Sequence, residues 1–519
     1  MTLLQSSGAV PCAASPVREP LSDGLAGRNA RGADVDAWLP VMPASSWCRA
    51  EPFLKATLVS AAAALLLWTV TTPAFWRFHF LSQRSPAALA LWGLAVGYGV
   101  VMLAALIWRV RLWRRYRPTP PVAQDVLPSM SVVIPAFNEG ALVRAAIRSV
   151  LKNRYPADRL ELIVVDDGST DDTWRHIRAA VRAAPDGPHI TTLRLSRNRG
   201  KRRALYEGFA RARGDVFVTM DSDSVLDSDA LRQVVSPLVR DRTIGCVSGC
   251  VQAMNPRESL ITRFLKCYFS LSFKFVRAYQ SEFRGVFCAP GALSAYRADR
   301  VRAIADEWLN QRFCGLPCET GEDRAMTNLF LRDGCMTAYQ GSAVVWSRVP
   351  HTYRGMANMF LRWARSNIRE TIVLWRFLLT PFRDRHRLAF TLNMVLVLLS
   401  LVLPPILICH SAALLMVCDG FVIRYLGGVL LFSVITAVVY YVNERDDDWV
   451  WLLAYGFFWT ACLSWILPYA ALTLRNTGWL TRGESRHASN DVVGGFGSRE
   501  PRTRPPHSLR VDPVWRYTT

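Results

Sequence analysis

Residues 160–173 read LELIVVDDGSTDDT, an apolar run that ends in a cluster of acidic and small residues. A short run of aliphatic and β-branched residues indicates a buried strand, and the Asp, Gly and Ser that follow indicate a turn into a helix. The pattern predicts a strand over residues 160–165 whose carboxyl end carries Asp166 and Asp167. Alone, it fits equally a structural turn in which Asp and Ser cap the next helix.

The same alternation of strand and helix recurs through the central part of the chain. The pattern predicts further strands at residues 131–134, 190–195 and 216–220, and helices at residues 141–152 and 173–183. This order is typical of an α/β protein with a Rossmann-like, doubly wound and mostly parallel sheet. Ligands of such sheets bind beyond the carboxyl ends of the strands, so the residues after each strand are the candidates for a site.

Acidic or amide side chains follow three of the predicted strands. They are Asn138 and Glu139 after Pro135, Asp166 and Asp167 after Val165, and Asp221 and Asp223 after Met220. Carboxylates do not bind a diphosphate directly, because both are anions, so a divalent cation has to lie between them; oxygen ligands suit Mg²⁺ or Mn²⁺. Asp-x-Asp also occurs at residues 34–36, 227–229 and 446–448, but only the pair at 221–223 follows an apolar strand.

A basic turn at residues 198–202, which includes Lys201, follows the predicted strand at residues 190–195. It fits either a solvated turn or a contact with a nucleotide diphosphate. The position directly after a strand favours the diphosphate contact.

Long uncharged apolar runs flank this central region. They lie at residues 56–75, 86–108, 388–409, 425–442 and 449–474. Each is about long enough to cross a hydrocarbon core of roughly 30 Å as a helix. Five Arg residues within 109–117 follow the second run, and such a density of positive charge is typical of the cytoplasmic side. We therefore expect a multi-pass protein of the cell inner (plasma) membrane whose central domain is cytoplasmic.

The number of crossings should be even, because the C-terminal tail carries further Arg residues that favour the cytoplasm. We expect six membrane elements, with residues 388–442 forming three short crossings or one re-entrant element and the acidic loop 444–448 on the far side. Two basic and aromatic stretches, residues 257–279 and 353–378, fit interfacial helices. Ordinary packing against the sheet is nearly as good an interpretation of the first.

The net charge of +21 does not indicate nucleic-acid binding, because no nucleic-acid motif accompanies it and much of the Arg flanks apolar runs. We interpret it as affinity for lipid headgroups and phosphate. The 12 Cys residues form no C-x-x-C pair and no zinc spacing with His, so reduced thiols are expected in a cytoplasmic domain.

Four motifs in order, SVVIPAFNE (131–139), VVDDGSTDDT (164–173), NRGKRRAL (198–205) and DSDS (221–224), resemble the family 2 glycosyltransferases with a GT-A fold. The resemblance implies that the first two motifs hold the uracil and ribose of a UDP-sugar and that Asp223 is the metal-contacting carboxylate. The donor-binding residues would be Pro135, Asn138, Glu139, Asp166, Asp167, Lys201, Asp221 and Arg362.

Three later motifs, FCAPGALSAYR (287–297), GEDRAMTN (321–328) and LRWARSNIRE (361–370), are similar to the processive branch that includes hyaluronan synthases, chitin synthases and the rhizobial chitin-oligosaccharide synthase. The resemblance implies that Asp323 is the catalytic base and that Arg362 meets the diphosphate. It assigns the acceptor to Cys288, Gly291 and Trp363. NTGWLTRG (476–483) is similar to a segment of hyaluronan synthases that returns to the active site.

The chain departs from the family pattern at two places. Met359 stands where the last motif usually has Gln, so the contact that Gln makes is unassigned. Ala289 and Pro290 follow Cys288 where relatives usually show other small residues, which bears on acceptor specificity.

The resemblance implies a membrane-bound, processive and inverting enzyme that makes a β-linked polysaccharide. A hyaluronan-type product from UDP-N-acetylglucosamine and UDP-glucuronic acid is the favoured interpretation. The alternatives are a chitin or chitin-oligosaccharide synthase that uses UDP-N-acetylglucosamine alone, a non-processive transferase to a lipid phosphate, and a transporter or receptor with an inactive domain. The expected partners are the sugar nucleotide, the growing polysaccharide and membrane lipids.

These interpretations divide the chain into six parts. They are a disordered tail (1–50), two transmembrane helices (51–108), the cytoplasmic GT-A domain (109–350), interfacial helices with the Arg-Trp motif (351–386), C-terminal transmembrane helices (387–475) and a cytoplasmic tail (476–519).

Overall fold

The computed structural model describes residues 50–71, 86–184, 187–417 and 421–476. The predicted N-terminal tail up to residue 49, and the C-terminal segment from residue 477 with most of the NTGWLTRG motif, lie outside the described residues.

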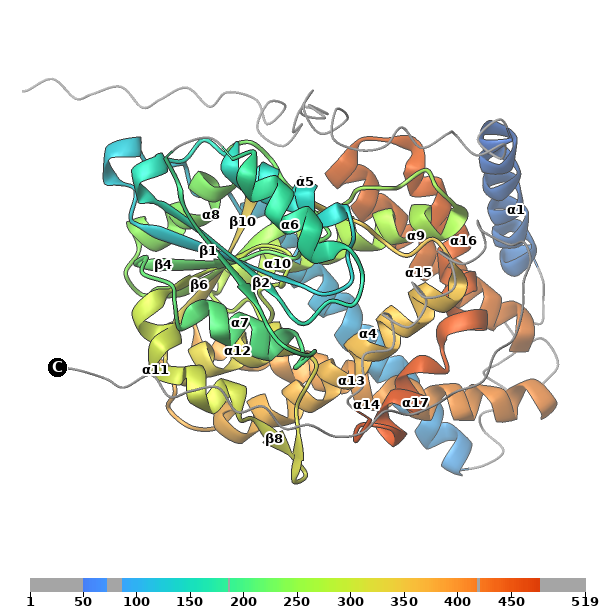
Figure 1. Cartoon of the computed structure of the whole chain (residues 1–519). Helices are drawn as coiled ribbons and strands as arrows, with labels where there is room; N and C mark the ends of the chain where they lie inside the picture. The colour runs from blue at the N-terminus through green and yellow to red at the C-terminus, as the bar shows by residue number, and fades with distance from the viewer. Residues whose placement is uncertain (1–49, 72–85, 185–186, 418–420, 477–519) are drawn as a thin grey trace, which may run out of the picture. The chain divides into compact units, whose positions relative to one another are not determined.

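An eight-stranded mixed sheet, with strand order β3-β2-β1-β4-β7-β6-β10-β5, forms the centre of the fold (Figure 1). β5 and β7 run antiparallel to their neighbours, and the other strands share one direction. The prediction of a mostly parallel sheet is therefore confirmed. The strands are β1 (Met130–Ala136), β2 (Leu160–Asp166), β3 (His189–Arg194), β4 (Val216–Thr219), β5 (Ser224–Leu226), β6 (Ile244–Ala253), β7 (Ser294–Arg297) and β10 (Met336–Ser347).

Helices cover both faces of the sheet, which is why β1 and β2 are buried along their whole length and lack polar alternation. Val132 and Ile134 belong to a core shared with α5, α6 and α8, whereas Val133 belongs to a second core shared with α7, α11 and α12. The helices are α5 (Leu142–Leu151), α6 (Thr173–Arg182), α7 (Lys201–Phe209), α8 (Ala230–Arg240), α11 (Ala298–Leu309) and α12 (Glu322–Arg332).

The two basic and aromatic stretches are helical. The first forms α9 (Leu260–Phe269), a π-helical turn η4 (Ser270–Val276) and α10 (Arg277–Glu282); the second forms α13 (Tyr353–Leu378). α9 and η4 pack against β6, and α10 packs against β10, so the sheet-packing interpretation of the first stretch is confirmed. The same stretch contacts α4, α15 and α16.

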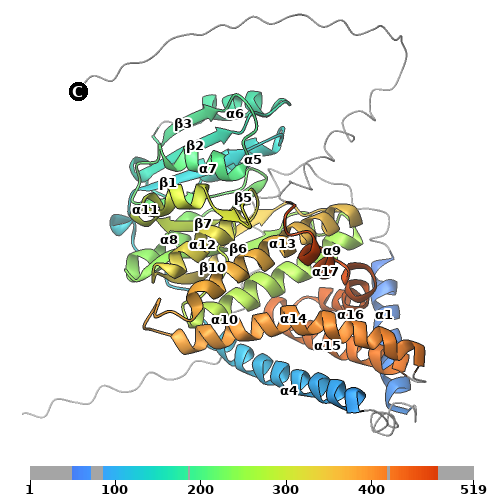
Figure 2. The same ribbon diagram turned by 90° about the horizontal axis from the view of Figure 1, so that it is seen from below.

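The remaining helices are apolar, and the first four of them are long. They are α1 (Glu51–Thr71), α4 (Pro86–Arg115), α14 (Arg387–Val417), α15 (Phe421–Glu444), α16 (Val450–Phe458) and α17 (Ile466–Leu472). Within the described residues, four segments are long and apolar enough to cross a membrane, namely Glu51–Thr71, Gly93–Arg115, Tyr425–Glu444 and Asp447–Leu472, and Arg387–Leu403 is a shorter apolar helix. Figure 2 shows α4, α14 and α15 alongside one another.

The expectation that the acidic loop 444–448 lies across the membrane from the central domain is wrong. Arg263 of α9 binds both carboxylate oxygens of Asp448 at 3.0 Å, and Lys274 of η4 lies 2.8 Å from Glu444. Because α9 and η4 pack on β6, a loop that pairs with them cannot lie roughly 30 Å away. Attraction between opposite charges places the loop next to the domain, and the positions of apolar runs in the sequence do not reveal such ion pairs.

Candidate active site

The carboxyl ends of β1 and β2 form one cross-linked edge. Ala136 lies opposite Asp166 in the parallel ladder, so the two loops leave the sheet side by side. The Asn138 backbone N–H donates to Ser169 Oγ at 3.0 Å, and the Thr170 N–H donates back to Asn138 Oδ1 at 2.9 Å. Asn138 adopts a left-handed conformation with φ 53°, which an Asn side chain tolerates.

Asp166 and Asp167 hold this edge together through backbone donors. Asp166 is fully buried, and its Oδ1 accepts from the Ser169 N–H at 2.9 Å. Asp167 accepts from the N–H groups of Arg199 and Gly200, both at 2.8 Å. The carboxylates therefore build the turn as predicted, but the predicted capping of the next helix is wrong, because α6 begins after Asp172 and that residue makes no side-chain cap bond. The contact of Asp166 and Asp167 with a nucleotide stays a prediction.

Lys201 joins the end of β4 to the start of α12. Its ammonium nitrogen lies 2.6 Å from Asp221 Oδ1 and 2.9 Å from Glu322 Oε1. Burial works against the charged ammonium, but the two carboxylates outweigh it and raise the pKa of Lys201 above its usual value. Gly291 leaves the room for this contact, because a Cβ there would lie 2.5 Å from the ammonium.

Glu322 and Asp323 begin α12 directly after Gly321, which has a left-handed φ of 78°. Burial tends to raise the pKa of Glu322, but Lys201 holds it down to about 2. Burial raises the pKa of Asp323 as well, and the neighbouring negative charge of Glu322 raises it further. Two adjacent carboxyl groups with opposite pKa shifts are typical of a site that separates a charge-holding role from a proton-accepting role.

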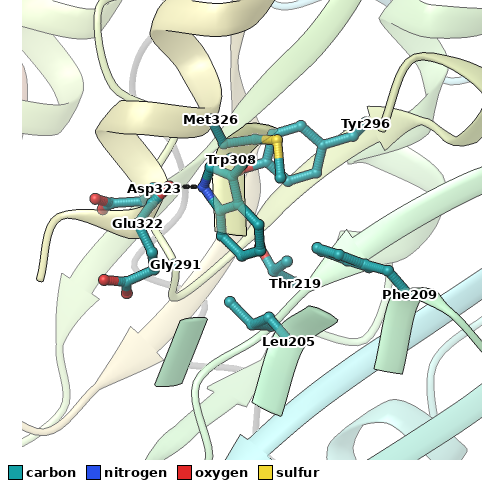
Figure 3. Close-up of a pocket in the computed structure, with 9 residues that line it drawn as sticks. All are labelled: Leu205, Phe209, Thr219, Gly291, Tyr296, Trp308, Glu322, Asp323 and Met326. Atoms are coloured by element: carbon teal, nitrogen blue, oxygen red, sulfur yellow. Dashed lines mark hydrogen bonds between the residues drawn. The ribbon is translucent and has the colours of Figure 1, made fainter. Parts of the chain in front are cut away.

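The carboxylate of Asp323 has two close neighbours. Its Oδ1 accepts from the Arg324 N–H at 2.7 Å, and the Cys288 thiol donates to its Oδ2 at 3.6 Å. Figure 3 shows the carboxylates of Glu322 and Asp323 on one side of a pocket, with Phe209 and Tyr296 on the other. The pocket is lined by Leu205, Phe209, Thr219, Gly291, Tyr296, Trp308, Glu322, Asp323 and Met326.

Asp223 is the carboxylate that suits a divalent metal ion. Within the described residues, no group of three or more His, Cys, Asp or Glu side chains forms a ready metal site. Asp221 is paired with Lys201, whereas Asp223 is half-buried beside it and accepts from Ser224 Oγ at 3.2 Å. Mg²⁺ is usually held by one or two carboxylates together with substrate phosphates and water, so this arrangement fits a metal that arrives with a diphosphate.

α13 carries Arg362 and Trp363, and it brings Arg362 near the Glu322 carboxylate. The positive charge of Arg362 helps to lower the pKa of Glu322, after the larger effect of Lys201. The Trp363 ring is half-buried and stacks on Tyr268 with a centroid distance of 6.3 Å. Met359 is buried in the hydrophobic core, so this position makes an apolar packing contact where the family pattern has Gln.

The structure thus gathers residues that the sequence singled out into two groups. One is the edge with Asn138, Asp166 and Asp167, and the other is the cluster of Lys201, Asp221, Cys288, Gly291 and Asp323.

An ion pair at the start of this helix was one interpretation of Glu322, Asp323 and Arg324, but sequence reasoning did not identify Lys201 as the partner of Glu322. It also missed the polar contacts between α12 and α13. Arg324 and Asn328 are four residues apart on α12, and so are Asn367 and Thr371, which accept from Arg324, on α13. That spacing marks a shared helix face and was the available signal.

Comparison with known proteins identifies the class. Residues 131–304 match the family described as Glycosyl transferase family 2. A mannosyltransferase from Pyrobaculum calidifontis, solved with GDP-Man and Mn²⁺, has a similar fold with a TM-score of 0.50 and 22% identity, over 72% of this chain and 99% of that chain. The predicted GT-A fold is therefore confirmed.

Curated relatives narrow the assignment. An N-acetylglucosaminyltransferase of Rhizobium sp. (strain N33) is 31% identical over 365 residues, which is 70% of this chain and 78% of the relative. Another, from Rhizobium meliloti (strain 1021), is 30% identical over 388 residues, 73% of this chain and 87% of the relative. The chain belongs to the family 2 glycosyltransferases, and the resemblance to rhizobial relatives is confirmed. These relatives favour the chitin-oligosaccharide alternative over the hyaluronan interpretation.

Proposed function

We propose that this protein is a membrane-bound, inverting glycosyltransferase that builds a β-linked chitin-type oligosaccharide from UDP-N-acetylglucosamine. The observation that carries the proposal is the contact of Lys201 with Asp221 and Glu322, which joins the end of β4 to the helix that bears Asp323. A carboxylate with a raised pKa thereby stands beside the strand ends where GT-A sheets receive ligands. The names of the rhizobial relatives support the choice of sugar.

In this mechanism Asp323 takes the proton from the acceptor hydroxyl as that oxygen attacks the anomeric carbon of the donor. The bond from the anomeric carbon to the diphosphate breaks in the same step and UDP leaves, so one displacement converts an α-linked donor into a β-linked product. Arg362 contributes positive charge beside the leaving diphosphate. Mg²⁺ or Mn²⁺ held by Asp223 would supply further charge neutralisation there.

The remaining candidate residues position the two substrates. We assign the nucleotide to the cross-linked edge, which is formed by Pro135, Asn138, Glu139, Asp166 and Asp167. The acceptor chain is assigned to Trp363, whose ring offers a flat apolar surface for a sugar, and to the loop that holds Cys288 and Gly291.

The proposal is tested by feeding the purified full-length protein UDP-N-acetylglucosamine and UDP-glucuronic acid, separately and together, with Mg²⁺ or Mn²⁺. We expect UDP release and chitinase-sensitive oligosaccharides from UDP-N-acetylglucosamine alone, and loss of both with a chelator. Polymer that requires both donors would instead show a hyaluronan synthase. A single sugar recovered on a lipid phosphate, or no UDP release, would equally overturn the proposal.

We further propose that the catalytic domain is cytoplasmic and that α1, α4, α14 and α15 cross the inner membrane. Two antiparallel pairs support four crossings. In one, Lys55 of α1 lies 2.9 Å from Asp447 just after α15, while Thr69 at the other end contacts Gly427. In the other, Arg109 of α4 binds Asn393 of α14 at 3.2 Å, and Met102 contacts Ser400 about two helical turns further along.

The last apolar segment, Asp447–Leu472, is proposed to return without crossing. Its start is held by Arg263 of α9, and Thr473 just after its end accepts from Arg365 of α13 at 2.9 Å. Tyr353 of α13 also donates to the Cys462 carbonyl at 2.7 Å. Both ends therefore contact helices that belong to the domain side.

This topology predicts that single cysteines introduced at Arg445 and Asn476, in a chain whose accessible native Cys are replaced, are labelled by a membrane-impermeant maleimide only after the cells are permeabilised. The reason is that both positions lie on the cytoplasmic side of four crossings. A cysteine at Thr71, at the opposite end of α1, is the matched control and should react in spheroplasts. Labelling of position 476 from outside would mean that Asp447–Leu472 crosses.

A further inference from the structure

Glu370 is a fully buried carboxylate on α13, eight residues after Arg362, and the reaction described above does not use it. Its Oε1 accepts from Gln311 Nε2 and from Arg369 Nε, each at 3.1 Å. Its Oε2 accepts from Asn328 Nδ2 at 3.0 Å. A buried carboxylate is costly unless it is paired in this way, and here each oxygen is paired.

The partners of Glu370 tie α13 to the helix that carries Asp323. Asn328 lies on α12, five residues after Asp323, and its Nδ2 also donates to the Glu370 carbonyl at 2.9 Å. Arg324, next to Asp323, donates to Asn367 and to Thr371 of α13, each at 3.1 Å. α12 and α13 are thus joined by hydrogen bonds that Arg324 and Asn328 of α12 donate to α13.

Gln311, which lies between α11 and β8 (Arg312–Phe313), connects a third element, α7, to Glu370. Gln311 Oε1 accepts from Arg202 Nη1 of α7 at 3.0 Å, while Gln311 Nε2 donates to Glu370. Arg202 follows Lys201, whose ammonium pairs with Glu322. Glu370 is therefore connected through Gln311 to Arg202 and the adjacent Lys201. Lys201 in turn pairs with Glu322, which directly precedes the candidate base Asp323.

Hydrogen bonds fix direction and distance, whereas apolar side chains allow one helix to slide over another. We propose that Glu370 is a positioning residue that sets the register of α13 against α12. In that register Arg362 lies beside the leaving diphosphate and Trp363 beside the acceptor sugar. Both are then aligned with Asp323, which accepts the proton. This inference rests on the proposed function and adds to it the residue that aligns the two halves of the site.

The test is Glu370→Gln in the full-length enzyme. The amide keeps the size of the side chain but presents an NH₂ group to Asn328 or Gln311, both of which are donors here, and it leaves Arg369 without its anionic partner. We expect kcat for chain extension to fall about 10- to 100-fold, as for a small misplacement of reacting groups. KM for UDP-N-acetylglucosamine should stay unchanged, more UDP should be released per sugar transferred, and the oligosaccharides should be shorter.

Two variants complete the design. Glu319→Gln removes an exposed carboxyl group from the loop before α12 and is the matched control. Its activity and product length are expected to match those of the parent. Asn328→Asp with Glu370→Gln exchanges donor and acceptor across the α12–α13 contact and should recover part of the lost kcat and product length.

Two outcomes would overturn the inference. One is a Glu370→Gln enzyme with the parent's kcat, UDP yield and product length. The other is a loss of activity that follows the folded fraction in a thermal-unfolding assay while product length stays normal, because that would show a purely structural role. Failure of the proposed function is distinguishable, since the parent enzyme itself would then make no oligosaccharide from UDP-N-acetylglucosamine.

Discussion

Replacing Asp323 by asparagine is expected to slow sugar transfer about 10²- to 10⁴-fold, the usual contribution of a general base. The amide cannot accept the proton of the acceptor hydroxyl, while the nucleotide edge at β1 and β2 is untouched. Donor binding, measured as the dissociation constant of UDP, should therefore remain at the parent value. Transfer by the variant at the parent rate would show that Asp323 is not the base.

The pH dependence of the parent enzyme is the second readout of this prediction. Asp323 works as a base only when it is deprotonated, and burial together with Glu322 raises its pKa. The rate should therefore rise with pH through an acid limb that lies above the ordinary Asp value of about 3.9. Glu322→Gln removes one cause of the shift, so its acid limb should move to lower pH.

Replacing Asp448 by asparagine is expected to destabilise the folded protein by about 3–5 kcal/mol, as when one partner of a buried ion pair is removed. The Asp448 and Arg263 side chains are each 4% exposed, and Lys55 and Lys266 share the same carboxylate. The variant would leave these cations without their common partner.

The neighbouring Asp447 provides a matched control for this prediction. It also pairs with Lys55, at 2.9 Å, but its side chain is 80% exposed. Exposed ion pairs contribute about 0–1 kcal/mol, so Asp447→Asn should change little. Thermal unfolding of both variants in one detergent gives the comparison, and equal shifts would contradict the idea that burial decides the strength of the pair.

The local parts of the fold were accessible from sequence because short-range patterns determine them. The predicted strand at residues 160–165 corresponds to β2 (Leu160–Asp166), and the predicted helix at residues 173–183 corresponds to α6 (Thr173–Arg182). Apolar runs and the acidic residues after them lie within one stretch of chain. The positions of Asp166 and Asp221 at strand ends followed directly, whereas Asp323 was identified only through the family resemblance.

Contacts between distant segments were not accessible in this way. β7 lies between β4 and β6 in the sheet, and no local sequence pattern indicates which strands a given strand will pair with. The pairing of Lys201 with Glu322 joins residues 121 positions apart, and that of Arg263 with Asp448 joins residues 185 positions apart. The acidic loop was misplaced for this reason, since its counter-charges lie on α9.

The ion pairs between the acidic loop and the helices α9 and η4 have a practical consequence for work on the isolated catalytic domain. A fragment trimmed to the catalytic domain would present Arg263, Lys266 and Lys274 to solvent with their carboxylate partners deleted. Tyr268, on which Trp363 stacks, belongs to the same α9. Truncation would thus loosen the platform proposed for the growing sugar chain, so the excised domain is a poor surrogate for the intact enzyme.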